Sequence, residues 1–223
     1  MVLTPLNERL LELPLFQGMS RSDVEAAVSM VKFSCMQIAQ GKVVVEDGGL
    51  CDSLFFLMEG KVNVTGFADD KGYSITETIA APDIVQPERI FGLMQRYSRT
   101  VITKTDCTLV RVGKQDFSVL SDVYEIFRLN LLNIISTQSQ RLARIPWRAK
   151  PNGIRHKIAR FVEERSLKPA GAKTFRIKME RLGREISESR LNTSRELNAM
   201  EAEGLITLRR GEINIKALER LIM

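Results

Sequence analysis

Seven consecutive residues, Ser189 to Arg195, read SRLNTSR and contain no acid. They supply hydroxyls, an amide, a leucine and two guanidinium groups. At the start of a helix, hydroxyls and free backbone N–H groups bind phosphate, Arg donates two hydrogen bonds to guanine, and Asn pairs with adenine. An acidic side chain here would be held against phosphates and would repel them. The stretch therefore predicts a helix whose first turn and a half enters the major groove of duplex DNA.

The distribution of charge also indicates a polyanionic partner for the C-terminal third. From Arg144 to Met223 there are 19 Lys and Arg against 10 Asp and Glu, whereas the other 143 residues hold 14 against 17. A basic module attached to a slightly acidic body is typical of nucleic-acid binding. The alternative is a chance excess of basic residues on a solvated surface.

No set of residues in the sequence is suited to catalysis or metal binding. The three cysteines, Cys35, Cys51 and Cys107, lie far apart, and His156 is the only histidine. Structural zinc needs four nitrogen or sulfur ligands, which these residues do not supply at suitable spacing. The sequence has no glycine-rich phosphate loop and no Ser/His/Asp set. We therefore expect no enzyme, no metal and three free thiols, buried or half-buried, in a reducing compartment.

The sequence gives no indication of a membrane or a secretory pathway. No apolar run reaches the roughly 18 residues that a membrane span needs. The N-terminal segment carries Glu8, Arg9 and Glu12 among its leucines, unlike a secretory leader. We expect a cytoplasmic protein.

The first two-thirds of the chain read as a helix followed by many short strands. Ser20 is placed to cap a helix, with Asp23 three residues later as in a capping box. From Lys32 to Val112, short runs of β-branched and aromatic residues alternate with turn formers. This pattern predicts a β-sandwich or a barrel-like roll. Between Pro87 and Tyr97 the strand pattern breaks, which predicts an inserted short helix or loop.

One long helix is predicted from Asp116 to Ile145, and it is apolar on two sides. The first side holds Val123, Phe127, Asn130, Ile134, Gln138 and Arg141, and the second holds Val119, Ile126, Leu129 and Leu132. A single stripe is enough to pack a helix on its own domain. The second stripe predicts a partner, most simply the same helix of a second subunit. The alternative is complete burial within the monomer.

After a linker with two prolines and a glycine, the C-terminal part reads as helix, strand, two helices joined by a tight turn, and a β-hairpin. This order predicts a winged helix-turn-helix. Ser189 would cap the second helix of the pair, and Leu197, Met200 and Leu205 would hold its far end. The side chains expected to project are Ser189, Arg190, Asn192, Thr193 and Arg195. Candidates for phosphate contacts are Lys178, Arg184, Arg209 and Arg210, the last two at the tip of the hairpin.

In this order of elements the chain resembles the Crp/Fnr transcription regulators over nearly its whole length. The stretch MERLGREISESRLNTSRELNAMEAEGLI follows the family's helix-turn-helix pattern without a gap, notably at Gly183, at Ser189-Arg190, at Arg195 and in the closing Glu-x-x-Gly-Leu-Ile. The resemblance places Ser189, Arg190, Leu191 and Arg195 at base-reading or adjacent positions. Leu191 replaces a frequent acidic reader, which points to a different operator, and a leucine can contact a thymine methyl group.

The resemblance implies an α+β protein with four parts. These are a double-stranded β-helix (jelly-roll-like) sensor domain over residues 1–115, a dimerisation helix over 116–145, a hinge over 146–153 and a winged helix-turn-helix domain over 154–223. It implies a bacterial homodimer whose recognition helices enter successive major grooves about 34 Å apart on a near-palindromic site. It further implies RNA polymerase as a partner, and a small effector that shifts the domain angle at the hinge.

The effector site departs from the cyclic-nucleotide-binding members of that family. In those members a Gly-Glu pair binds the ribose hydroxyl, and the Arg of an Arg-Ser or Arg-Thr pair binds the cyclic phosphate. The matching pairs here are Pro87-Glu88 and Tyr97-Ser98. A tyrosine cannot neutralise a phosphate, and the flanking Arg96 and Arg99 would point elsewhere on a strand.

This departure disfavours a cyclic nucleotide and predicts no cofactor, which leaves the effector unidentified. The residues of this candidate pocket are Glu88, Arg96, Tyr97, Ser98 and Arg99. The alternative function is a cyclic-nucleotide receptor or interaction module that does not bind DNA.

Overall fold

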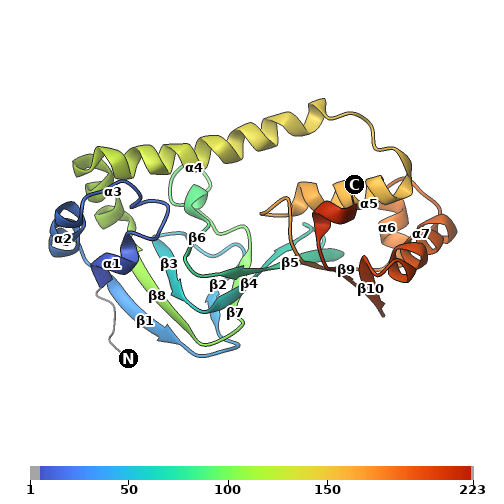
Figure 1. Cartoon of the computed structure of the whole chain (residues 1–223), viewed down its shortest axis with the longest axis horizontal. Helices are drawn as coiled ribbons and strands as arrows, with labels where there is room; N and C mark the ends of the chain where they lie inside the picture. Colours follow the sequence, from blue (N-terminus) through green and yellow to red (C-terminus); the bar gives the residue numbers. More distant parts are fainter. Residues whose placement is uncertain (1–5, 222–223) are drawn as a thin grey trace. The chain divides into compact units, whose positions relative to one another are not determined.

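The computed structural model describes residues 6–221, so the ends of the predicted first and last domains, residues 1–5 and 222–223, lie outside it. The chain forms two compact units (Figure 1). Unit 1 comprises Met1–Val62 and Ile79–Arg144, and unit 2 comprises Asn63–Thr78 and Ile145–Met223. Unit 2 is therefore assembled from two segments that are far apart in the sequence.

Unit 1 begins with two helices, α1 (Leu6–Leu10) and α2 (Arg21–Met30). Ser20 Oγ accepts a hydrogen bond from the backbone N–H of Asp23 at 3.1 Å. The Asp23 carboxylate accepts one from the backbone N–H of Ser20 at 3.4 Å. These two bonds form the capping box that the sequence predicts, and they satisfy N–H groups that would otherwise lack partners.

Two groups of antiparallel strands form the rest of the β-domain, which confirms the predicted strand-rich region. The strands of the first group follow the order β1-β8-β3-β6. In the second group, β7 lies between β2 and β4 and pairs with β2. The Phe16 ring lies 5.8 Å from that of Phe56 and 5.1 Å from that of Phe127 in the core. The strands are β1 (Ser34–Ile38), β2 (Val43–Val45), β3 (Ser53–Glu59), β4 (Lys61–Phe67), β5 (Tyr73–Ala80), β6 (Asp83–Val85), β7 (Thr100–Thr103) and β8 (Cys107–Gly113).

The prediction of one helix from Asp116 to Ile145 is wrong, because the chain breaks at Tyr124. Helix α3 spans Lys114–Val123 and α4 spans Glu125–Arg144. The rings of Phe117 and Phe127 lie 5.2 Å apart and both are fully buried. On an unbroken helix these residues would be about 15 Å apart along the axis. The break allows both rings to enter one core.

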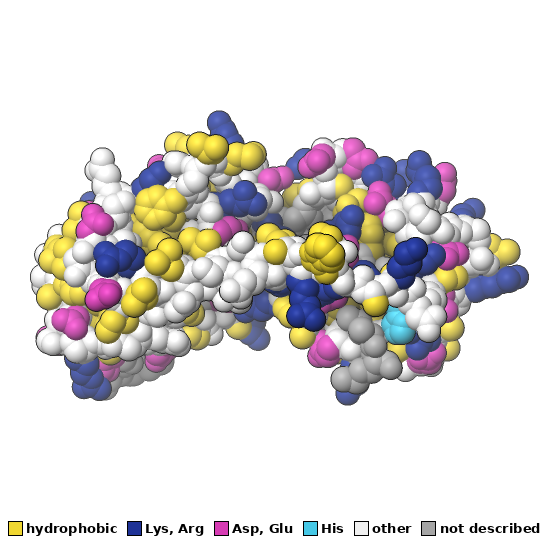
Figure 2. All heavy atoms as spheres, turned by 90° about the horizontal axis from the view of Figure 1, so that it is seen from above, with side chains coloured by type: hydrophobic (Ala, Val, Ile, Leu, Met, Phe, Trp, Pro, Cys, Tyr) yellow, Lys and Arg dark blue, Asp and Glu magenta, His cyan; other side chains and the backbone are white. Residues whose placement is uncertain are grey.

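The outer side of α3 and α4 is apolar and exposed. Figure 2 shows hydrophobic side chains gathered over the α3 end of this helix pair, and mostly polar ones along the second half of α4. The opposite side is buried through Phe127 and Leu131. The alternative of complete burial within the monomer is therefore wrong. Side chains 41–53% exposed are Val119, Val123, Ile126, Leu129 and Leu132.

Unit 2 packs three helices on one face of a sheet whose order is β10-β11-β9-β5-β4. Its core includes Phe161, Phe175, Leu182, Leu197 and Ile213. The elements of the C-terminal segment are the 3-10 turn η2 (Ile145–Trp147), α5 (Gly153–Arg165), β9 (Lys173–Ile177), α6 (Met179–Glu185), α7 (Arg190–Ala202), β10 (Ile206–Arg209), β11 (Glu212–Ile215) and the 3-10 turn η3 (Leu218–Leu221).

The sequence pattern does not predict that the β4–β5 hairpin joins this sheet. Strand β5 pairs with β9 from Tyr73↔Ile177 to Glu77↔Lys173 (Figure 1). Lys173 Nζ lies 2.7 Å from Glu77 Oε1, and each side chain is only 2% exposed. The hairpin is therefore fixed to the C-terminal segment by a five-residue ladder and a buried ion pair.

Two of the three thiols are buried, as predicted, but Cys35 is exposed. The prediction for Cys35 is wrong because β1 lies at the edge of its sheet, and Cys35 occupies one of its outward-facing positions. Within residues 6–221, no cluster of three His, Cys, Asp or Glu side chains is arranged to hold a metal ion. Over the same range, no helix has the length and apolarity of a membrane span.

Candidate nucleic-acid interface

Helices α6 and α7 meet at a tight turn that depends on a glycine. A Cβ atom built on Gly183 would lie 2.9 Å from the carbonyl oxygen of Glu188 and 3.5 Å from Thr193 Oγ1. Any side chain at this position would therefore push the turn away from α6. Within the turn, Ser187 adopts a left-handed conformation with φ of 55°.

Ser189 caps α7, as the sequence predicts. Its Oγ accepts a hydrogen bond from the backbone N–H of Asn192 at 3.1 Å. The next three residues, Arg190, Leu191 and Asn192, are exposed, and so is Arg195. Leu191 is 60% exposed although it is apolar. The start of α7 thus presents two guanidinium groups, an amide and an aliphatic side chain to the outside of unit 2.

The prediction that Thr193 projects from this helix is wrong. Thr193 is fully buried, and its hydroxyl donates to the carbonyl oxygen of Ser189 at 2.9 Å. The absence of a side chain at Gly183 leaves the space that Thr193 occupies. Thr193 therefore packs α7 against α6 and is not available to a ligand.

The far end of α7 is held by apolar packing, as predicted. Leu197 and Met200 are fully buried, while Leu205 is partly buried against the same core. Helix α7 is thus anchored at its C-terminal half, and its N-terminal half is presented outward. The candidate phosphate contacts Lys178, Arg184, Arg209 and Arg210 are all exposed.

Cations on α5 pair with acids before, within and after α7, which sequence reasoning missed. Arg155 Nε donates to Glu196 at 2.9 Å, and its two terminal nitrogens donate to the Glu203 carboxylate at 2.9 and 2.6 Å. Lys157 Nζ lies 2.6 Å from Glu188. These pairs join residues 31 to 48 positions apart, so no local spacing signals them. They keep carboxylates on the helix side of unit 2 paired with cations.

The Arg155–Glu203 pair predicts a pH-dependent contribution to stability. Hydrogen bonds from Arg155 hold the pKa of Glu203 below its ordinary value of 4.5. The contribution is therefore present above that value and is lost as the pH falls through the lower folded-state pKa. Urea unfolding at about pH 5 and about pH 3 should show wild type losing more stability than Arg155→Met, since the variant lacks this pair. Equal losses in the two proteins, or the same difference in the variant Lys216→Met of an exposed cation, would contradict the assignment.

Among the candidate effector residues, Tyr97 lies inside the β-domain. Tyr97 is buried, and its hydroxyl donates to the carbonyl oxygen of Ser53 at 2.7 Å. Burial raises the pKa of Tyr97, so the hydroxyl stays protonated. Burial likewise raises the pKa of the nearby Cys51 thiol. Tyr97 therefore stabilises the interior of the β-domain.

Two of the other candidates, Ser98 and Arg99, are bonded to one glutamine side chain. Both the backbone N–H and the hydroxyl of Ser98 donate to Gln86 Oε1, at 2.9 and 3.1 Å. Gln86 Nε2 in turn donates to the carbonyl oxygen of Arg99 at 3.0 Å. Arg96 is exposed and donates to the carbonyl oxygen of Gly48 at 2.7 Å. Glu88 lies in the 3-10 turn η1 (Pro87–Arg89).

A pocket of about 320 Å³ lies beside Tyr97 in unit 1. Its lining contains two carboxylates, Glu46 and Asp52, and no lysine or arginine. Carboxylates repel a phosphate, so this pocket is unsuited to a cyclic phosphate. The lining residues are Val43, Val44, Val45, Glu46, Gly49, Leu50, Asp52, Phe55 and Tyr97.

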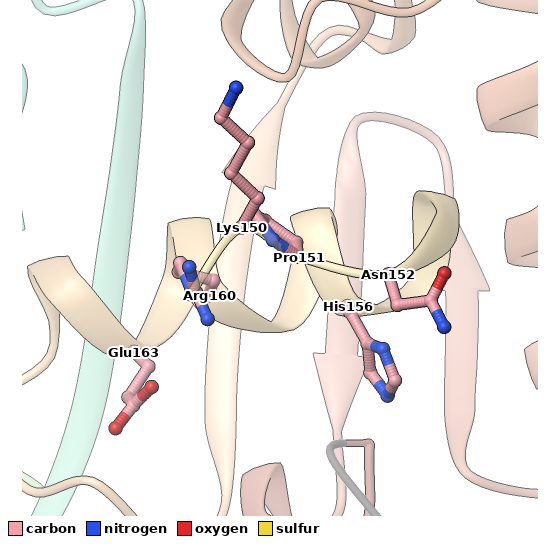
Figure 3. A pocket seen from close by; sticks show the side chains of 6 residues that line it. All are labelled: Lys150, Pro151, Asn152, His156, Arg160 and Glu163. Atoms are coloured by element: carbon pink, nitrogen blue, oxygen red, sulfur yellow. The ribbon is translucent and has the colours of Figure 1, made fainter. Parts of the chain in front are cut away.

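A second pocket, of about 210 Å³, lies at the start of α5 (Figure 3). It contains His156, Lys150 and Arg160, but their side chains point in different directions, and the Lys150 ammonium group points away from the others. Glu163, also in its lining, is bound at both oxygens by Arg148, at 2.7 and 3.0 Å. This group of residues does not converge on a common ligand.

Residues 35–124 match the family model of the cyclic nucleotide-binding domain. The match covers less than half of the chain, and it includes residues 63–78, which belong to unit 2. The potassium channel KOR1 of Oryza sativa subsp. japonica is 26% identical over 138 residues, which are 60% of this chain and 15% of that protein. The chain therefore spans only a small part of this relative.

By fold, the chain is similar to regulators of the catabolite activator type. The catabolite activator protein of Thermus thermophilus superposes with a TM-score of 0.52 at 20% identity, over 93% of this chain and 96% of that one. The c-di-GMP-responsive global regulator CLP of Xanthomonas campestris gives a TM-score of 0.50 at 17% identity, over 88% of this chain and 99% of that one. At these identities the likeness concerns the fold.

Proposed function

We propose that the chain is a sequence-specific DNA-binding transcription regulator, with unit 2 as its winged helix-turn-helix. The observation that carries this proposal is the start of α7, where Arg190, Leu191, Asn192 and Arg195 are exposed without an acid among them. The helix is anchored from its other end by Leu197 and Met200. Such a rigid, basic helix start is the geometry with which a recognition helix enters the major groove. In this proposal β10 and β11 form the wing, with Arg209 and Arg210 at its tip.

The same proposal makes the protein a homodimer joined through α3 and α4. The apolar side chains that are exposed along these helices, from Val119 to Leu132, form a stripe. Isolated apolar side chains are normal on a surface, whereas a contiguous stripe marks an interaction site. A twofold pair would bury this stripe and present two copies of α7. Each copy would then read one half of a near-palindromic site, about 34 Å from the other half.

In this scheme the β-domain is a sensor for a small molecule other than a cyclic nucleotide, or a relic of such a sensor. Its support is chemical, since the family resemblance puts Tyr97 in the place of the arginine that binds a cyclic phosphate, and Glu46 and Asp52 line the adjacent pocket. RNA polymerase is a further proposed partner, and the proposal includes no catalytic activity.

The second candidate is a cyclic-nucleotide receptor that does not bind DNA, and the domain match of residues 35–124 favours it. Calorimetry with cyclic AMP and cyclic GMP separates the two. Heat of binding that saturates with either nucleotide would support the receptor, and we expect none.

The experiment that tests the proposed function is selection of bound duplexes from random DNA by the purified protein. We expect enrichment of inverted repeats whose half-sites are centred about one helical turn apart. Enrichment of single, unrepeated sites would contradict the dimer. Recovery of random sequences, or of no DNA, would contradict sequence-specific DNA binding.

A further inference from the structure

The turn of the β4–β5 hairpin lies beside the proposed wing. The pairing of Tyr73 with Ile177 places residues 68–72 next to the end of β9. On the other side of β9, the backbone N–H of Ile177 donates to the carbonyl oxygen of Gly211 at 3.0 Å. Gly211 lies in the turn of the wing. The hairpin turn, the end of β9 and the wing turn therefore lie together at one end of the sheet of unit 2.

A groove of about 550 Å³ opens at this end of the sheet. In β9, Phe175 and Ile177 are buried under the helices, whereas Arg176 is exposed on the opposite face, and Lys178, which follows the strand, is also exposed. The groove therefore includes side chains that point away from the core. Its lining residues are Phe67, Lys71, Gly72, Tyr73, Ser74, Arg176, Ile177, Lys178 and Gly211.

The lining of the groove is basic. It holds three cations, Lys71, Arg176 and Lys178, and no carboxylate. The Lys71 ammonium group stands 4.6 Å from the centre of the Phe67 ring. The aromatic ring holds this ammonium group at the edge of the groove.

Two of the neighbouring acids are already paired with cations. The Glu212 carboxylate lies 2.9 Å from Arg176, and hydrogen bonds from Asn214 and Arg176 lower its pKa. Asp70 in the hairpin turn lies 2.9 Å from Arg181 of α6. Asp69 is a third, exposed acid of the same turn. The pairs reduce the repulsion that a polyanion would meet at the groove. Arg176 bonds Glu212 through its Nε atom, so its two terminal nitrogens are the atoms that can contact a phosphate.

Polar side chains extend the groove along the same face of the sheet. The hydroxyls of Thr65 and Thr76 are hydrogen-bonded at 2.9 Å, and Thr174 donates to Asn214 at the same distance. Hydroxyl and amide groups beside cations are the groups with which proteins contact the DNA backbone.

We propose that this groove binds the phosphate backbone of duplex DNA next to the wing. The DNA-contacting surface then includes Lys71 and Arg176, so a hairpin from the first half of the sequence takes part in it. The inference rests on the proposed function, because the groove shares Lys178 and the wing turn with the proposed DNA interface. The basic lining of the groove favours a phosphate as the ligand. Because the groove adjoins the turn of the proposed wing, we expect this phosphate to belong to the DNA duplex that the wing contacts.

The test measures the salt dependence of binding by fluorescence anisotropy, with the full-length protein and its selected duplex. Each phosphate contact that is lost lowers the slope of log K against log salt by about 0.9. The variant Lys71→Ala/Arg176→Ala should therefore have a slope smaller by roughly 2, with the order of preferred sequences unchanged. Lys71→Arg/Arg176→Lys should keep the slope of the wild type.

The matched control is Lys216→Ala/Arg220→Ala, which removes the same charge from exposed positions that follow the other end of β11. A slope in the groove variant equal to that of the wild type, or to that of this control, would overturn the inference and leave the proposed function intact. Failure of the wild type to bind any duplex would overturn the proposed function itself. Circular dichroism on each variant shows that a smaller slope does not come from unfolding.

Discussion

Lys173→Met is expected to destabilise unit 2 by about 3–5 kcal/mol, because it leaves the Glu77 carboxylate buried without its cation. The two side chains are 2.7 Å apart and each is 2% exposed. Glu77 also accepts the backbone N–H groups of Leu167 and Lys168. These two bonds remain in the variant, but the buried carboxylate no longer has the Lys173 ammonium group beside it. Urea unfolding followed by hydrogen exchange on peptides of unit 2 measures the loss.

A second variant separates the charge effect from the loss of packing. Glu77→Gln/Lys173→Met removes both charges and keeps a carbonyl oxygen that can accept one of the two backbone N–H groups. Its stability should lie between those of the wild type and Lys173→Met, because one N–H group and the carbonyl oxygen of Ala170 lose their partners but no unpaired charge is buried. Lys216→Met, at an exposed position, is the control and should change stability by less than about 0.5 kcal/mol. An equally small change for Lys173→Met would show that the pair does not hold the hairpin.

The sequence could predict those features of the structure that depend on residues close together in the chain. Ser20 and Ser189 each precede a run of helix formers, and each caps the helix that follows it. Capping depends on residues three positions apart, so it is visible in one short stretch. The buried positions Leu182, Leu197 and Met200 likewise follow from helical periodicity. The candidate interface could be predicted because most of it lies on one helix.

Features that depend on distant residues could not be predicted. Glu77 and Lys173 are 96 positions apart, and β5 looks like an ordinary strand of the β-domain until β9 is seen beside it. Thr193 is polar and stands among exposed neighbours, yet the space left by Gly183 buries it. The break at Tyr124 follows from two phenylalanines that share one core. In each case a tertiary contact outweighs the local pattern.

Arg190→Ala and Arg195→Ala are each expected to weaken binding of the selected duplex by about 1–3 kcal/mol, or roughly 5- to 150-fold. Both side chains are exposed on the first two turns of α7, and neither contributes to the core. The stability of the fold should therefore be unchanged, and each substitution should lower only the affinity for the selected duplex. If each guanidinium group contacts a base, each variant should also relax the preference at one position in each half-site.

The distinction between base and phosphate contacts comes from repeating the selection with each variant. Relaxed preference at one position of both half-sites identifies a base contact, whereas an equal loss on all sequences, with a smaller salt slope, identifies a phosphate contact. Arg220→Ala removes the same charge from an exposed site in η3 and should leave both affinity and preference close to those of the wild type. Affinities of Arg190→Ala and Arg195→Ala that match this control would exclude the start of α7 as the DNA-reading surface. That outcome would favour the alternative that the basic residues of this turn are a chance excess on a solvated surface.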